Sequence, residues 1–296
     1  LAGGGGPPDV AAVEIAIAAG PGGNGHFELS HASLEDQTLR DPRAITASSH
    51  RAGHPPEEAF GGNALTEWRA APDDAKPWWS IDFGRILRFG GLVIDWPEKL
   101  PPRGYEVAVS NDGTNWTPIY QATRALGPRS HISAHGAEAG YLRITFSNPD
   151  CAALRALTPK PDAFSSTPNE FIHSIAADYP RGLHPRYWHR EQSYWTPVGS
   201  PEGKRRALIN EEGMVEVDEA GFSLEPFILT KSGLVTWADV ETSATMEKHG
   251  APLPRVTWKR KYLKLEILPW VDGKGDELTL RVTYRLKCSA SSAARR

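Results

Sequence analysis

Residues 105–113 read Tyr-Glu-Val-Ala-Val-Ser-Asn-Asp-Gly. Apolar side chains at the odd positions alternate with Glu106 and Ala108, a period of two that is typical of a strand with one buried and one wet face. The closing Asp-Gly supplies the positive φ angles that a tight hairpin turn needs. The segment therefore predicts an antiparallel strand that ends in a hairpin turn.

The same alternation recurs on both sides of this segment. Residues 92–96 and 142–146 each place apolar side chains at every second position. The chain holds 28 glycines and 25 prolines, together about 18% of its residues against a background of about 12%. Such an excess suits many short strands joined by turns. We therefore predict an all-β fold.

Size and charge exclude several classes of protein. The chain has 296 residues, room for about two domains, and a formal net charge of -3, which gives no broad basic field for nucleic acid. No apolar run is long enough to span a bilayer. Cys151 and Cys288 fall in different predicted domains, so we expect two free thiols. The favoured compartment is extracellular or periplasmic, which the thiols neither support nor exclude.

Four landmarks in loop-and-strand order carry a family resemblance. They are residues 47–50 (Ala-Ser-Ser-His), 61–68 (Gly-Gly-Asn-Ala-Leu-Thr-Glu-Trp), 78–84 (Trp-Trp-Ser-Ile-Asp-Phe-Gly) and 110–116 (Ser-Asn-Asp-Gly-Thr-Asn-Trp). Together they resemble the discoidin or coagulation factor 5/8 type C family. The resemblance implies a jelly-roll β-sandwich that binds glycans or lipid head groups through loops at one end. It also implies that Trp68, Trp79 and Trp116 are core residues.

A second resemblance concerns the region after residue 168. Its landmarks are residues 179–182, 185–187, 191–196, 210–213 and 235–240. They resemble the β-sandwich that precedes the helical barrel in bacterial six-hairpin glycosidase-like proteins. The resemblance implies a catalytic (α/α)6 barrel as a partner in cis, and no helical periodicity of that length follows residue 287.

These patterns predict an order of domains along the chain. The fold we expect is a discoidin-like jelly roll plus a second antiparallel β-sandwich. The predicted parts are a remnant of a preceding β-sandwich with a linker (1–42), the discoidin-like domain (43–161), a linker (162–168), the second β-sandwich (169–287) and a disordered tail (288–296).

The resemblance places ligand binding in loops, where polar and aromatic side chains could orient a sugar. The residues we single out for carbohydrate binding are His50, Arg51, His54, Arg69, Trp78, Trp96 and Arg103. The arginines would donate to a carboxylate or to vicinal hydroxyls. Trp96 ends a strand just before the loop at 97–104, and Trp78 is expected to point away from Trp79, since neighbours on a strand face opposite ways. The alternative is that all of these are solvated or structural residues.

Two further kinds of site follow from the resemblances. The family often binds a structural Ca²⁺ through a loop whose aspartates are missing here, which leaves backbone carbonyls, Asn63 and Thr66 as oxygen ligands of reduced affinity. In the second domain, a segment dense in aromatic residues and arginines is typical of an interface. The interface residues we predict are Arg186, Tyr187, Tyr194 and Trp195. An internal network of Arg–Glu pairs is the alternative.

We expect a non-catalytic carbohydrate-binding region of a larger bacterial glycoside hydrolase-like protein. One alternative is a scaffold for the absent barrel that binds nothing itself. The other is a glycoside hydrolase that uses Glu216 and Asp218, which could share one face of a strand. Both carboxylates are expected to be solvated, so the hydrolase is the less favoured of the two. The sequence does not specify the sugar.

Overall fold

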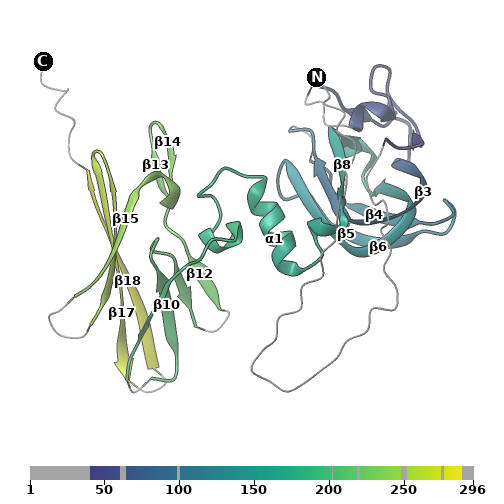
Figure 1. Ribbon diagram of the computed structural model, residues 1–296. Coiled ribbons are helices and arrows are strands. Elements are labelled where there is room, and N and C mark those ends of the chain that lie inside the picture. Colours follow the sequence, from purple (N-terminus) through teal and green to yellow (C-terminus); the bar gives the residue numbers. More distant parts are fainter. Residues whose placement is uncertain are drawn as a thin grey trace, which may run out of the picture. The chain divides into compact units, whose positions relative to one another are not determined.

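The computed structural model describes residues 41–60, 65–98, 101–201, 203–218, 221–247, 252–274 and 277–288 (Figure 1). The predicted remnant at 1–42 and tail at 288–296 therefore lie almost wholly outside the described residues. The chain divides into two compact units, Leu1–Glu170 and Phe171–Arg296. Nearly all regular structure in both units is antiparallel strand, which confirms the all-β prediction.

The first unit is built on a six-stranded sheet in the order β1-β3-β6-β4-β5, with β8 also paired to β3. A short pair, β2 with β7, lies off this sheet. The strands are β1 (Ala44–Ala47), β2 (Trp68–Arg69), β3 (Trp78–Asp95), β4 (Tyr105–Ser110), β5 (Thr117–Ala122), β6 (Arg129–Phe146), β7 (Ala153–Leu154) and β8 (Ala156–Pro161), with 3-10 turns at Pro56–Ala59, Pro149–Cys151 and Asp162–Phe164.

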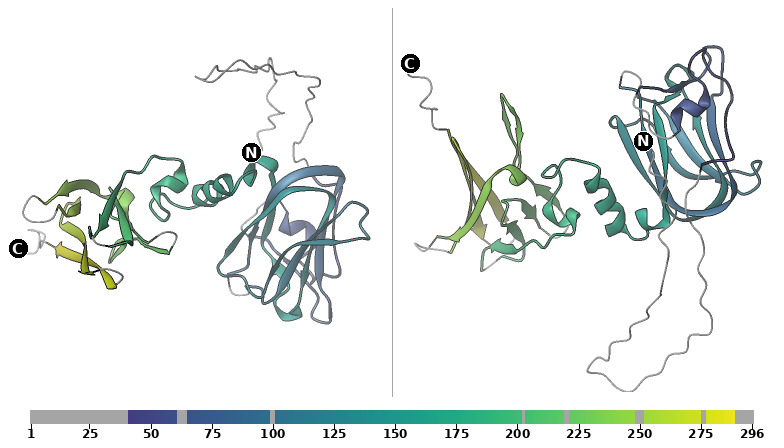
Figure 2. Two further views of the ribbon diagram at one scale, coloured as in Figure 1. Left: turned by 90° about the horizontal axis from the view of Figure 1, so that it is seen from below. Right: turned by 45° about the horizontal axis from the view of Figure 1, so that its top comes forward.

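Two 18-residue strands, β3 and β6, run through the whole unit and pair with each other (Figure 2). Their register shifts twice, between Asp82 and Leu87 and between Phe89 and Gly91. β3 is flanked by β1 at residues 79–82 and by β8 from Phe89 to Asp95. Gly91 has a φ of +154°, and a Cβ there would lie 2.1 Å from the carbonyl oxygen of Ile132. The bend therefore requires glycine at this position.

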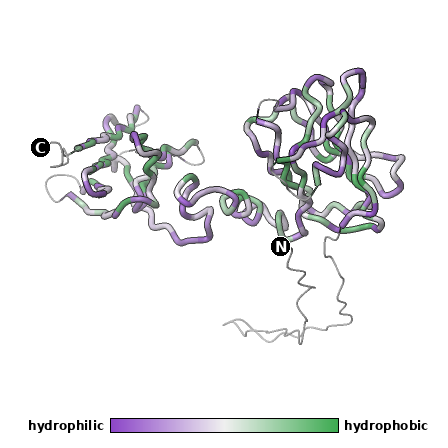
Figure 3. Tube along the Cα trace, turned by 90° about the horizontal axis from the view of Figure 1, so that it is seen from above, coloured by the Kyte–Doolittle hydropathy of each residue, from purple (hydrophilic) through white to green (hydrophobic). Residues whose placement is uncertain are grey.

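The core of the first unit lies between the two halves of these strands. Its largest fully buried side chains include Trp68, Trp79 and Trp96. The predicted alternation is confirmed in β6, where residues 142, 144 and 146 are buried and residues 143 and 145 are not. In β3, Leu92 and Ile94 are buried as predicted, but Val93 between them is buried as well, so both faces of the strand are covered there. Figure 3 shows apolar and polar residues interspersed along the strands of each unit.

The second unit holds two four-stranded antiparallel sheets, β12-β11-β10-β9 and β15-β16-β17-β18, and a small hairpin, β13-β14. Side chains from both larger sheets form one core, in which Ile209 and Val215 meet Trp258 and Ile267. The strands are β9 (Trp195–Gly199), β10 (Arg206–Asn210), β11 (Val215–Val217), β12 (Phe222–Leu224), β13 (Ile228–Thr230), β14 (Gly233–Val235), β15 (Glu241–Met246), β16 (Pro254–Arg260), β17 (Leu263–Lys274) and β18 (Glu277–Cys288), with 3-10 turns at Arg186–His189 and Trp237–Asp239.

One helix, α1 (Pro168–Ala177), begins where the sequence predicts the end of a linker. Its start is marked by Thr167, whose Oγ1 accepts a hydrogen bond of 3.1 Å from the amide of Glu170, and by Pro168 at the first helical position. Both are ordinary signals of a helix start. The Ser-Ser-Thr-Pro sequence at 165–168 was interpreted only as loop chemistry, so the helix was missed.

Candidate functional site

One end of the first unit gathers loops from distant parts of the chain. Ala47, the last residue of β1, is opposite Trp79, and Tyr105, the first residue of β4, is opposite both Phe146 and Ala122. The loops 48–77, 96–104, 123–128 and 147–155 therefore emerge together. The start of β1 and the end of β8 pair with the middle of β3, away from this end. We call this loop-bearing end the loop end.

Backbone hydrogen bonds tie these loops to one another. The amide of Arg51 donates to the carbonyl of Arg69 at 2.9 Å, and that of Ala70 to the carbonyl of Ala152 at 3.0 Å. The amide of Ser147 donates to the carbonyl of Gly104 at 2.9 Å. The loop end is therefore one connected surface rather than a set of independent loops.

Asp74 fixes the beginning of the first long loop. Its carboxylate accepts from the hydroxyls of Ser48 and Ser49 at 2.5 and 2.6 Å, and from the amide of Lys76 at 3.0 Å. Burial acts to raise the pKa of Asp74, but these hydrogen bonds outweigh it and hold the pKa below its usual value. The Ala-Ser-Ser-His landmark is thus held in place by a charged acceptor that sequence reasoning did not identify.

The predicted carbohydrate-binding residues of this loop region differ in how free their side chains are. His50 and Arg51 are exposed. His54 is half-buried, and its Nδ1 lies 3.0 Å from the carbonyl oxygen of Glu67, which can only accept, so Nδ1 donates. Arg69 is paired with the carboxylate of Glu67. Two of the predicted donors are therefore already engaged within the protein.

An open groove lies beside these loops and has a volume of about 790 Å³. Arg103 lies in its lining and is exposed. Arg103 is also the one predicted carbohydrate-binding residue among the lining residues, which are Arg103, Gly104, Tyr105, Glu106, Gln121, Ala122, Thr123, Thr145, Ser147 and Asn148. Hydroxyl, amide, carboxylate and guanidinium groups therefore converge in one open groove. Its remaining polar residues were not predicted, because three separate strands and two loops contribute them.

The prediction that Trp96 stacks on a sugar is wrong. Trp96 is 0% exposed, its ring centroid lies 4.8 Å from that of Tyr105, and its Nε1 donates to Ser130 Oγ at 2.8 Å. Trp96 shares the inner face of the sheet with Leu92 and Ile94. No face of this ring is available to a ligand.

Trp78 lies outside the core, as predicted, but its ring is already stacked against the guanidinium of Arg143. The guanidinium of Arg143 lies 4.3 Å from the ring centroid of Trp78 and 4.0 Å from that of Trp116, so the three side chains form a cation–π stack. Trp116 is half-buried and not part of the hydrophobic core, contrary to the prediction. Burial lowers the pKa of Arg143, and the two electron-rich ring faces offset part of its desolvation.

The calcium prediction is only partly within the described residues, because Asn63 and the glycines before it lie outside them. Thr66 is described, and its hydroxyl donates to the carbonyl of Glu58 at 3.1 Å. Among the described residues, no group of three or more His, Cys, Asp or Glu side chains could hold a metal ion. The predicted ligands are backbone carbonyls, Asn63 and Thr66 rather than carboxylates, so the ion stays a prediction.

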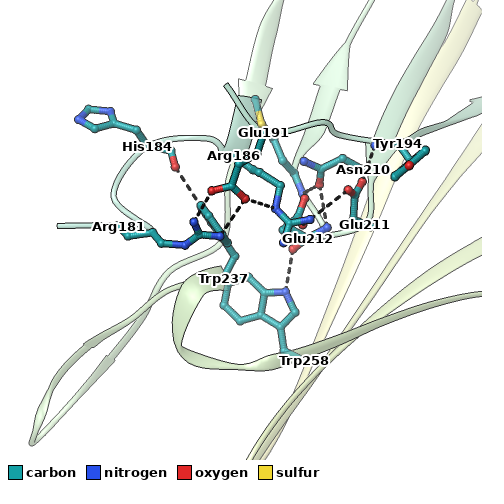
Figure 4. A network of polar contacts seen from close by, with 11 residues as sticks. Arg181, His184, Arg186, Glu191, Tyr194, Asn210, Glu211, Glu212, Trp237 and Trp258 are labelled. Carbon is teal, nitrogen blue, oxygen red and sulfur yellow. Dashed lines mark hydrogen bonds and ion pairs between the residues drawn. The ribbon is translucent and has the colours of Figure 1, made fainter. Parts of the chain in front are cut away.

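The second unit contains a network of charged side chains around Arg186 (Figure 4). Arg186 contacts Glu212 at 2.9 Å, Glu191 at 3.3 Å and Glu211 at 3.4 Å. Arg181 also pairs with Glu191. The other oxygen of Glu211 accepts from the amide of Tyr194 at 2.7 Å.

Several buried polar atoms of this network have no hydrogen-bond partner. They include both carboxylate oxygens of Glu212, Nε of Arg186, Nε2 of His189 and the Ser193 hydroxyl. The Glu212 side chain is 4% exposed, so its contact with Arg186 is a buried ion pair without well-aligned hydrogen bonds. Burial and the neighbouring Glu211 raise the pKa of Glu212 to about 7. Burial, then Glu212, raises the pKa of Glu225 to about 7.

Glu212 and Glu225 make the second unit sensitive to pH. Because the folded state binds these protons more tightly than the unfolded state, stability is lost as pH rises from about 4.5 to about 7. A shift of this size corresponds to at most about 3–4 kcal/mol per group, and solvent screening lowers this figure for Glu225, which is only half-buried. Unfolding in urea at pH 5.5 and 8 should therefore give a lower free energy of unfolding at pH 8.

The variant Glu212→Gln isolates this effect. Its free energy of unfolding should fall less between pH 5.5 and 8 than that of the wild type, because one titrating carboxyl is gone. The pKa of His189 is lowered, so this histidine makes the free energy of unfolding fall as the pH decreases. This effect is the same in the wild type and in the variant. An equal pH dependence in the two proteins would contradict the assignment.

The predicted interface residues have mixed surroundings. Tyr187 is 41% and Tyr194 is 66% exposed, whereas Trp195 is half-buried with its ring centroid 6.1 Å from that of Tyr187. Arg186 belongs to the internal network described above. An exposed aromatic patch and an internal network of Arg–Glu pairs are thus both present, and docking stays a prediction.

The carboxylates named for a hydrolase lie elsewhere in this unit. Glu216 lies on β11 and is half-buried. Asp218 follows the strand with a φ of +60° and pairs with Arg205 at 3.5 Å. The carboxyls with raised pKa, Glu212 and Glu225, were not predicted, because only tertiary packing shows that they are buried.

None of the described helices is long and apolar enough to cross a membrane.

No curated protein matches the chain. Among solved structures, the chain is similar to chitosan-binding module 1 of a chitosanase/glucanase from Paenibacillus sp. IK-5, with 28% identity, 39% of this chain and 92% of that chain covered, and a TM-score of 0.36.

Two further solved structures are similar. Chitosan-binding module 2 of the same Paenibacillus enzyme, in complex with chitotriose, is 26% identical, with 42% of this chain and 99% of that chain covered and a TM-score of 0.38. The family 32 carbohydrate-binding module of NanJ from C. perfringens, in complex with galactose, is 19% identical, with 39% and 91% covered and a TM-score of 0.36. The family model described as the F5/8 type C domain matches residues 44–156. This segment of the chain is therefore an F5/8 type C domain.

Proposed function

We propose that the F5/8 type C domain binds a carbohydrate at its loop end. The observation that carries the proposal is the open groove of about 790 Å³, into which hydroxyl, amide, carboxylate and guanidinium groups converge. A sugar presents donors and acceptors at fixed spacing, and a site with a few convergent polar groups can orient it. The connected backbone of the loops supports the proposal, because it presents these groups without a large loss of entropy on binding.

Arg103 would be the principal donor of this site. A guanidinium donates in a planar fork, which suits a carboxylate or a pair of vicinal hydroxyls. Glu106 and Gln121, which are hydrogen-bonded to each other across the β4–β5 pair, and Asn148 at the groove would complete the hydroxyl contacts. With Trp96 buried and Trp78 stacked on Arg143, binding would depend on hydrogen bonds more than on aromatic stacking.

The domain would serve a larger protein. We infer a non-catalytic role, in which the domain holds a glycoside hydrolase-like protein on its polysaccharide. A single polar site of this kind binds weakly, and neighbouring modules raise the avidity through effective concentration. The second unit would accompany a catalytic domain in cis, as its resemblance to six-hairpin glycosidase-like proteins implies.

Removal of Arg103 tests the site. Titration calorimetry of the full 296-residue chain with chitotriose and with galactose, the ligands named for the two complexes above, follows a glycan-array screen. For any glycan that binds, Arg103→Ala should raise Kd by about ten- to a hundredfold, because a hydrogen bond to a charged donor contributes about 1.5–3 kcal/mol. Arg85→Ala, at the bend of β3 away from the loop end, should leave Kd unchanged.

The main alternative is a scaffold that binds no glycan. It is favoured by the exposed Tyr187 and Tyr194, which a neighbouring domain could cover. A glycan array without hits would support the scaffold and remove the binding proposal. Glycoside hydrolysis by Glu216 and Asp218 is the less favoured alternative, and a wild-type protein without hydrolytic activity would remove it.

A further inference from the structure

The second unit ends in a long edge strand. Among the described residues, β18 pairs with β17 along all 12 of its residues without a register shift, and its other edge pairs with no strand. The strand holds no proline and no inward charge. Natural edge strands are usually protected by such devices, because free backbone donors and acceptors recruit another strand.

The inner face of β18 continues the apolar core but is not fully covered. Leu278, Leu280 and Val282 are half-buried, whereas Tyr284 is 42% and Leu286 is 50% exposed. The residues opposite Tyr284 and Leu286 on β17 are the buried Ile267 and Leu265. The inner-face side chains are therefore buried on β17 and more exposed on β18. Such a gradient is expected where no further strand covers the edge of a sheet.

The other edge of the same sheet differs in chemistry. On β15, the residues that share a face with the core residues of β16 are Thr242, Ala244 and Met246. This row is short and mostly small or polar, whereas the row of β18 is apolar throughout. The two edges are therefore not equivalent, and only β18 presents an apolar row at its free edge.

We propose that β18 is a self-association strand, which pairs antiparallel with β18 of a second copy of this chain about a two-fold axis at Val282. In this register the exposed Leu286 lies opposite Leu278 of the second copy, and Tyr284 opposite Leu280. On the outer face, Arg285 lies opposite Thr279 and Arg281 opposite Thr283. The two sheets of four strands would become one continuous sheet.

Charge selects this register over its neighbours. Glu277 lies opposite Lys287 of the second copy at both ends of the paired strands, so that two ion pairs close the interface. If the second strand is shifted by two residues in one direction, Arg281 lies opposite Arg285 of the second copy. If it is shifted by two residues in the other direction, Arg281 lies opposite Arg281 of the second copy. Like charges directly opposite each other oppose pairing. A shift of the second strand by one residue would place its charged residues on the core face of the sheet.

Charge reversal at the strand ends tests the register. The measurement is sedimentation velocity of the full chain over a range of concentrations. Glu277→Lys and Lys287→Glu should each weaken the dimer by about tenfold in Kd, because each creates two like-charge pairs. The double variant Glu277→Lys/Lys287→Glu should restore the wild-type Kd. Glu241→Lys on β15 is the matched control and should have no effect.

Disulfide cross-linking gives a second readout. In a Cys151→Ser/Cys288→Ser background, Val282→Cys should form a dimer under mild oxidation, because directly opposite residues lie within disulfide reach. Leu278→Cys should not, because its copy lies eight residues away, about 27 Å along the strand. The proposal is overturned if the wild type is monomeric at all concentrations, or if neither charge reversal changes the Kd of the dimer. A failure here leaves glycan binding by the first unit untouched.

Discussion

Replacement of Trp96 with alanine should lower the free energy of unfolding of the F5/8 type C domain by about 3–5 kcal/mol. The indole is fully buried, lies 4.8 Å from the ring of Tyr105 and 6.4 Å from that of Phe146, and donates to Ser130. Truncation leaves a large cavity and removes the indole N–H that donates to Ser130, whose hydroxyl keeps its contact with the Tyr105 hydroxyl. Urea unfolding of the full chain, resolved by hydrogen exchange of peptides from each unit, measures the loss.

Trp116→Ala is the matched control, because it removes the same side chain from a half-buried position. Its cost should be smaller, about 1–2 kcal/mol, since it removes a cation–π contact with Arg143 and creates no enclosed cavity. Equal costs for the two variants would mean that Trp96 is not a core residue. Glycan binding that survives in folded Trp96→Ala protein is consistent with a structural role.

Replacement of Arg186 with alanine should lower the free energy of unfolding of the second unit by about 3–5 kcal/mol at pH 8. The change removes the cation that lies 2.9 Å from the buried Glu212 and also contacts Glu191 and Glu211. A buried carboxylate without its partner must either remain charged at high cost or take up a proton. The cost should therefore shrink at pH 5.5.

Arg181→Ala is the control for this prediction. Arg181 contacts the same network through Glu191 but is exposed, so its loss should cost no more than about 1 kcal/mol. Adding Glu212→Gln to Arg186→Ala should recover part of the lost stability, because the buried carboxylate that has lost its cation is no longer present. If Arg181→Ala and Arg186→Ala have equal effects, Glu212 is not the group that makes Arg186 important.

Much of the fold follows from a period of two in the sequence. Leu92, Ile94 and Trp96 share one face by that period, and all three are fully buried. The same period predicts a buried Trp96, whereas its position next to a loop suggests exposure, and the period is the signal that the structure supports. Helix α1 was missed because a serine- and threonine-rich segment signals both a loop and a helix cap.

The candidate sites were less accessible to sequence reasoning. The loop end was predicted from the family resemblance, but the groove combines Arg103 with Glu106, Gln121 and Thr145, which only the strand register brings together. The raised pKa values of Glu212 and Glu225 depend on burial, which no local pattern encodes. Trp116 was placed in the core by resemblance, whereas Arg143 holds it on the outer face.

The long strands β3 and β6 carry both halves of the first unit, because each continues through the register shifts of their pairing. Neither half can unfold without disturbing the other, so the domain should unfold as one cooperative element. Deletion of a single residue in the bend would turn every following side chain of β3 to the opposite face. A change in chain length should therefore be tolerated better in the loops of the loop end than in this bend.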